Sequence, residues 1–82
     1  MNNVIDTGNS KIVIQSCQAD WANIGVFHHA TGKSLYRHVA IPSLEVTDTA
    51  PVKVGDLQLE LFSAELLDVR DRLLSKVKEL AA

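Results

Sequence analysis

The sequence contains few of the features that mark an enzyme, a membrane protein or a nucleic-acid-binding protein. It has one cysteine in 82 residues, which excludes an intramolecular disulfide and favours a reducing compartment. Its formal net charge of −2 supplies no field that would attract nucleic acid or an anionic membrane. The first residues lack the basic and apolar regions of a signal peptide, and no apolar run approaches the roughly 18 residues that span a bilayer. We therefore expect a cytoplasmic protein with neither a membrane nor a nucleic acid as its partner.

Motifs for catalysis, cofactors and metals are also missing. Cys17 could act as a nucleophile only beside a histidine and an orienting third group, and nothing in the sequence fixes that geometry. The Gly-Lys-Ser string at 32–34 lacks the upstream glycine of a phosphate-binding loop, because Phe27 occupies that position. His28 and His29 are adjacent, so on a strand they point to opposite faces and cannot share one ion. We predict that the protein is not an enzyme and holds no cofactor and no metal.

A β-hairpin is predicted over residues 22–41, with its turn at Thr31-Gly32-Lys33. A polar stretch that contains glycine and lies between two apolar runs is typical of such a turn. Because side chains alternate across a strand, a two-residue loop in either register places even-numbered residues of the first strand beside odd-numbered residues of the second. One face is then aliphatic and carries Ile24, Val26, His28, Ala30, Leu35, Arg37, Val39 and Ile41. The opposite face is aromatic and rich in histidine, and carries Gly25, Phe27, His29, Tyr36, His38 and Ala40.

The residues before the hairpin divide into a polar arm and a strand. Residues 1–10 are expected to form a loose N-terminal arm, ordered only near Val4 and Ile5. Residues 11–17 favour a short strand, on which alternation places Cys17 on the face opposite to Ile12 and Ile14.

The residues after the hairpin are harder to assign. Residues 43–54 are predicted to form an extended excursion or a small second hairpin, since alternating apolar residues flank a turn-like stretch. Alternating leucines at 56–61 favour a strand, and a helix capped by Asp56 is the competing interpretation. We favour the strand because Ser63 supplies a better-placed helix cap.

An amphipathic helix over 63–80 is the strongest signal in the chain. Apolar residues recur at helical spacing and form one stripe, whereas charged residues lie on the opposite side. Acidic residues lead and basic residues follow, which suits the helix dipole. The stripe consists of Phe62, Leu66, Val69, Leu73, Val77 and Leu80.

These elements predict a single α+β domain over 1–82, in which a small antiparallel sheet of three to five strands carries one helix on one face. Short connections favour antiparallel neighbours, and the aliphatic sheet face is the one large partner for the helix stripe. The predicted core consists of Ile12, Ile14, Ile24, Val26, Leu35, Val39, Ile41, Leu57, Leu59, Leu61, Leu66, Val69, Leu73 and Val77.

One helix covers one face, so the aromatic face stays open unless the N-terminal arm or residues 43–54 fold over it. A contiguous exposed patch with rings more often marks an interface than the surface of a monomer. We predict a non-enzymatic protein–protein interaction module that forms a homodimer or binds another protein through the open face or an edge strand. Small inhibitors encoded by phages or mobile elements are one class to which it could belong. The predicted interaction surface consists of Phe27, His29, Tyr36, His38 and Trp21.

A small-ligand or metal-binding domain is the alternative function for the same face. His29 and His38 share that face in a diagonal arrangement, and Tyr36 is the third candidate. The spacings that mark zinc sites are absent from the sequence, which makes this the second hypothesis.

Overall fold

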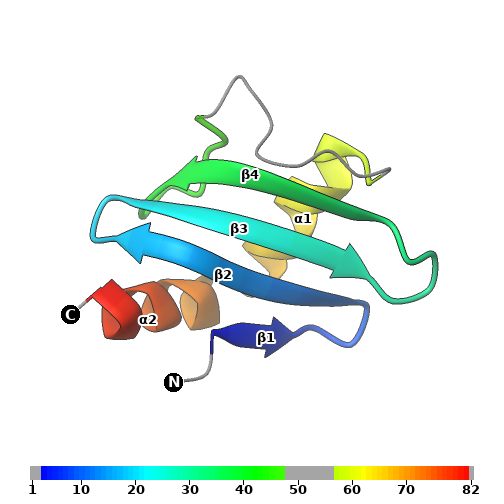
Figure 1. Cartoon of the computed structure of the whole chain (residues 1–82), viewed down its shortest axis with the longest axis horizontal. Helices are drawn as coiled ribbons and strands as arrows, with labels where there is room; N and C mark the ends of the chain where they lie inside the picture. The colour runs from blue at the N-terminus through cyan, green and yellow to red at the C-terminus, as the bar shows by residue number, and fades with distance from the viewer. Residues whose placement is uncertain (1–2, 48–56, 82) are drawn as a thin grey trace.

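A computed structural model describes residues 3–47 and 57–81 and shows an α+β domain (Figure 1). Four strands form an antiparallel sheet in the order β1-β2-β3-β4, which is also their order along the chain. Two helices follow the sheet, so the predicted fold class is confirmed. The elements are β1 Val4–Asp6, β2 Ser10–Gln18, β3 Trp21–His28, β4 Ser34–Ala40, α1 Leu59–Asp68 and α2 Arg70–Ala81.

The β3–β4 hairpin has the predicted faces but a longer connection than predicted. Gly25 pairs with Tyr36 in the register, and β3 ends at His28. The predicted two-residue loop is therefore wrong. The observed pairing differs from the predicted one by an even number of residues, so each side chain stays on its predicted face. Thr31 organises the longer loop, since its Oγ1 accepts a hydrogen bond from the Lys33 N–H at 3.3 Å.

The predicted N-terminal arm is ordered beyond Val4 and Ile5: Val4–Asp6 form the strand β1, and a turn connects it to β2 at Ser10. β1 pairs with β2, and Ile5 lies opposite Ile12 in the core. The connection between the strands is closed by Thr7, whose N–H donates to the Ser10 carbonyl at 2.8 Å and whose Oγ1 accepts from the Ser10 N–H at 2.9 Å. The polar side chains of this segment make the hydrogen bonds of a turn. From the sequence alone, the same polar composition suggested a disordered arm.

A bulge in β2 reverses the predicted direction of Cys17. The pairing of β2 with β3 shifts between Ile14 and Ser16, which leaves one extra residue on β2. Cys17 therefore lies opposite the buried Ala22 and packs against the core, with its Sγ 3.9 Å from the Val77 carbonyl of α2. The thiol faces the helix layer and not the aromatic face.

The first helix begins earlier than predicted, so the strand over 56–61 is wrong from Leu59 onward. Gln58 precedes the helix and makes no side-chain capping hydrogen bond, whereas Ser63 lies inside α1. Leu59 and Leu61, which were expected in the core, are 42% and 44% exposed. The helix buries the Phe62 ring instead. Burial of this large ring favours the helix over the strand that the alternating leucines suggest.

The predicted single helix over 63–80 is interrupted at Val69. This residue has φ −116° and ψ 27°, and α2 follows at once, with the Leu73 N–H donating to the Val69 carbonyl at 2.8 Å. The interruption allows α1 to pass behind β3 and β4 while α2 lies beside β2 and β1 (Figure 1). No glycine or proline stands at this position, and Val69 itself is buried in the core.

The segment after β4 accounts for part of the predicted excursion over 43–54. Leu44 is buried at φ 62°, and Val46 forms a single bridge with Val39 at the edge of β4. The Thr47 N–H donates to the His38 carbonyl at 3.0 Å, so this short segment follows the strand edge. The rest of the predicted excursion lies outside the described residues.

The core lies between the aliphatic sheet face and the stripe shared by the two helices. Its largest fully buried apolar side chains are Phe62, Ile12, Ile24, Leu66, Leu73, Val26, Val39 and Val77. In residues 3–47 and 57–81, no helix combines the length and the apolar character that crossing a membrane requires.

The helical phase of α1 predicts different costs for two adjacent substitutions. Phe62→Ala should lower the free energy of unfolding by about 3–5 kcal/mol, because it empties a fully buried ring site. Leu61→Ala is the matched control and should cost less than about 1 kcal/mol, since its side chain is 44% exposed. Urea denaturation followed by circular dichroism measures both values. A larger cost for Leu61→Ala than for Phe62→Ala would indicate the strand and contradict this helix.

Candidate interaction surface

Four rings follow one another on the sheet face that points away from the helices. We call Trp21, His38, Tyr36 and Phe27 the aromatic row. The register places them on every second residue pair of the β3–β4 hairpin, on the opposite side of the sheet from the buried Ile24 and its neighbours. α1 crosses behind these two strands in Figure 1, so the row lies on the face that the helices leave uncovered.

Each of the three largest rings stands opposite a small residue. Trp21 pairs with Ala40, Tyr36 with Gly25, and Phe27 with Ser34. The small partners give the rings room to reach diagonally across the hairpin, where long side chains can meet. Two ring pairs result. The Trp21 and His38 rings are stacked with centroids 5.1 Å apart, and Phe27 meets Tyr36 edge to face at 5.3 Å.

The Tyr36 ring packs directly against the backbone of Gly25. A Cβ added at Gly25 would lie 2.5 Å from the ring Cε1 and 2.8 Å from Cδ1, which is closer than atoms can approach. Tyr36 is consequently only 8% exposed within a single chain. The sequence predicts Tyr36 to be an exposed contact residue, but in the structure it is buried. The more exposed Phe27 ring packs against it.

The two ends of the aromatic row differ in their polar neighbours. The ammonium group of Lys11 lies 5.2 Å from the Phe27 ring centroid, a cation–π contact. At the other end, Asn23 donates from Nδ2 to Ser16 Oγ at 2.9 Å, and its Oδ1 lies 2.8 Å from His38 Nδ1. Because Oδ1 can only accept, His38 Nδ1 carries the proton, and this hydrogen bond fixes the ring against Trp21.

His29 does not belong to the aromatic row. It lies in the turn after β3, and its exposed ring places Nε2 3.3 Å from the Asp6 carboxylate. His38 pairs with Asn23, six residues before His29, so the two histidines stand roughly 20 Å apart along the sheet. The site expected from His29, His38 and Tyr36 is therefore not assembled. Within 3–47 and 57–81, no three His, Cys, Asp or Glu side chains are grouped so that they could hold a metal ion.

The pKa of Asp6 lies below its ordinary value. The main cause is the Gly8 N–H, which donates to the carboxylate at 2.8 Å, and the His29 ring contributes next. The Asp6 side chain is exposed, so these contacts hold the turn in place without forming a desolvated pair. The Asp6–His29 pair lies at the edge of the sheet, away from Trp21.

Comparison with known proteins supplies no relative for this chain. No family model matches it, and neither a curated protein nor a solved structure does so. The geometry of the surface is therefore the basis for inferring its function.

Sequence reasoning identified the rings but missed the residues that arrange them. Gly25 and Ala40 are assigned to the aromatic face and Ser34 to neither face, and none is recognised as the partner of a large side chain, because the predicted register is displaced. The roles of Lys11 and Asn23 depend on contacts between strands, which only the correct register reveals. The signal that could have found them is the small residue spaced to face each ring.

The contact between Gly25 and Tyr36 predicts a coupled stability effect. Gly25→Ala should lower the free energy of unfolding by about 1–3 kcal/mol, because the added methyl group displaces a buried ring. In a Tyr36→Ala background the same change should cost much less, because the ring that it meets is gone. Urea denaturation of the four proteins in this double-mutant cycle measures the coupling. Equal costs in both backgrounds would show that the ring does not rest on Gly25.

Proposed function

We propose that this protein is a non-enzymatic interaction module that forms a homodimer through its aromatic row. The observation that carries the proposal is the division of the sheet into two unlike faces. The helices bury the aliphatic face, whereas Trp21 and Phe27 stay partly exposed on the other. Large rings held in fixed positions are the side chains that most often anchor protein interfaces.

The charge on this face favours a second copy over a strongly charged partner. Among the described residues of the face, Lys11 beside Phe27 lies opposite Asp6 in the register, which leaves no excess of either sign. A surface of this kind can complement itself about a twofold axis, as isologous dimers require. An axis crossing the strands at the middle of the row would place Trp21 of one copy near Phe27 and Lys11 of the other.

The rigidity of the row also favours association. Stacking and hydrogen bonding fix His38 and Trp21, and edge-to-face contact with a buried Tyr36 fixes Phe27. Side chains that are already ordered lose less conformational entropy when a partner covers them. We further propose the cytoplasm as the setting, where the lone thiol of Cys17 stays reduced against α2.

Sedimentation equilibrium tests the dimer. At about 100 µM the wild type should sediment with twice the monomer mass, whereas Trp21→Asp and Phe27→Asp should sediment as monomers, because each places a charge in the interface. Leu67→Asp is the matched control: it puts the same charge on a side chain of α1 that is 56% exposed, and it should remain a dimer.

Circular dichroism confirms that each variant is folded before its mass is interpreted. A monomeric wild type at this concentration would contradict the proposal. A Phe27→Asp protein that still dimerises, or a Leu67→Asp protein that does not, would place the interface elsewhere.

A further inference from the structure

An apolar groove lies where the turn between β2 and β3 and the residues after β4 face α2. Its volume is about 510 Å³, which is within the range of pockets that hold small molecules. We call it the Leu74 groove. Ile41 and Leu74 pack against the core, so the groove is on the helix side of the sheet and is separate from the aromatic row. Its apolar lining consists of Ala19, Ile41, Pro42, Leu74, Val77 and Ala81.

Hydrogen bonds hold the walls of the Leu74 groove together. The Ile41 N–H donates to the Asp20 carbonyl at 3.0 Å, which joins the end of β4 to the turn between β2 and β3. Arg70, the first residue of α2, donates from Nη2 to the Pro42 carbonyl at 3.3 Å. The groove is therefore formed before a ligand arrives, and binding requires little further ordering of the protein.

The floor of the groove offers apolar surface that the core leaves incompletely covered. Val77 is buried, whereas Ile41 and Leu74 are only partly buried although they pack against the core. An apolar body laid in the groove would remove the rest of their surface from water, which favours binding in proportion to the area covered.

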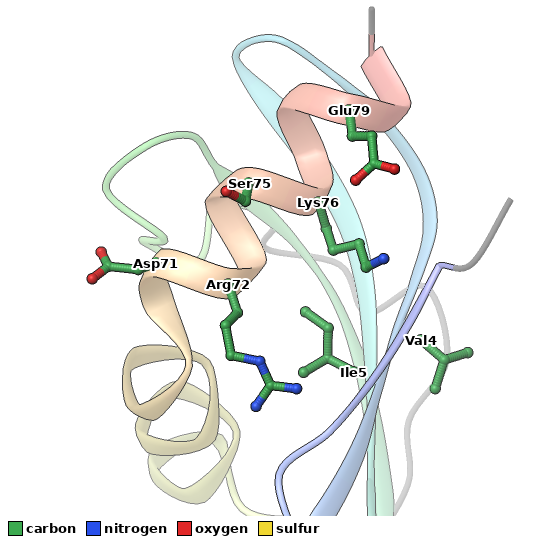
Figure 2. A pocket seen from close by; sticks show the side chains of 7 residues that line it. All are labelled: Val4, Ile5, Asp71, Arg72, Ser75, Lys76 and Glu79. Carbon is green, nitrogen blue, oxygen red and sulfur yellow. The ribbon is translucent and has the colours of Figure 1, made fainter.

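The two sides of α2 differ in the charges that they carry. Figure 2 shows the groove on the β1 side, whose lining mixes two cations with two carboxylates: Arg72, Lys76, Asp71 and Glu79. Among the described residues that line the Leu74 groove, by contrast, Lys78 is the one charged residue. An occupant of this groove therefore meets positive charge alone.

The Lys78 ammonium has no acidic partner in the described chain. The residues three and four positions from Lys78 on either side are not acidic, so the helix itself supplies no ion pair: Leu74, Ser75, Ala81 and Ala82. Asp20 in the facing turn makes no ion pair with it, and within 3–47 and 57–81 no other carboxylate does. The ammonium is consequently available to a negative group at the rim of the groove.

The size of the groove favours a small molecule over a protein partner. Seven described residues line it, whereas a stable protein interface takes roughly 20–30 residues from each side. An apolar floor with one charged group at its rim is also the usual composition of a small-ligand site.

We propose that the Leu74 groove binds a small amphipathic anion, whose apolar body covers Leu74 and Ile41 and whose negative group meets the Lys78 ammonium. Medium-chain alkyl carboxylates have this chemistry. The site is independent of the aromatic row, so it can be present whether or not the protein dimerises.

Isothermal titration calorimetry with decanoate, below the concentration at which it forms micelles, tests the site. Wild-type protein should bind decanoate with a Kd below about 1 mM. Lys78→Gln should weaken binding about three- to five-fold, because it removes the ion pair at the rim. Lys76→Gln is the matched control, since it removes the same charge from the β1 side of the same helix, and it should bind as the wild type does.

A second pair of variants tests the apolar floor. Leu74→Gln should weaken decanoate binding at least about ten-fold, because it replaces apolar surface of the groove with a polar amide. Leu67→Gln makes the same change on an exposed position of α1 and should leave the affinity unchanged. Circular dichroism establishes that each variant is folded, and sedimentation establishes its mass.

Two further ligands and one spectrum separate this site from general stickiness. Acetate has the charge without the chain, and decyltrimethylammonium has the chain with the opposite charge, so neither should bind. In amide NMR spectra, decanoate should shift the signals of Ala19, Leu74 and Ala81.

Failure of wild-type protein to bind decanoate would overturn the proposal, as would equal affinities of the Lys78→Gln and Lys76→Gln variants. Shifts centred on Trp21 would place the ligand on the aromatic row, and binding of decyltrimethylammonium as tight as that of decanoate would show that charge plays no part. A changed sedimentation mass of Leu74→Gln would assign the groove to a second copy. Each of these results contradicts a small-anion site in the Leu74 groove.

Discussion

The packing of one aliphatic sheet face against one helical stripe is the constraint on which the rest of the structure depends. Phe62, Leu66 and Leu73 supply the stripe and are fully buried against the sheet. A chain of 82 residues buries a modest share of its surface, so its stability depends on how completely these two apolar surfaces cover each other. The helix breaks at Val69 so that both halves reach the same face, and consequently no described helix is left for the other.

On the uncovered face, small residues stand opposite large rings across the β3–β4 hairpin. Gly25 accepts the Tyr36 ring, and the buried tyrosine then supports Phe27, so a residue without a side chain determines how the exposed rings stand. The polar contacts of Asn23 do the same for His38 and Trp21.

Features that depend on neighbouring residues in the sequence could be predicted, whereas features that depend on contacts between distant elements could not. Alternation along each strand depends on local pattern alone, so the two faces of the hairpin were predicted correctly even though the loop length was wrong. The start of α1 could not be decided locally, because the leucines around Leu59 satisfy both periods and burial of Phe62 selects the helix. The bulge that turns Cys17 inward and the break at Val69 have no local marker, since both arise where strands and helices pack. Of the predicted surface, the register unites Trp21, His38, Tyr36 and Phe27 and separates His29.

Intrinsic fluorescence tests the central claim most directly, because Trp21 is the single tryptophan and lies on the proposed interface. If a second copy covers the aromatic row, dilution from about 100 µM to about 1 µM should shift the emission of Trp21 to longer wavelength as water replaces the partner. The shift should follow the mass measured at each concentration. An emission spectrum that stays constant across this range, while the mass changes or while the protein remains a monomer, would show that the aromatic row is not the surface through which the protein associates.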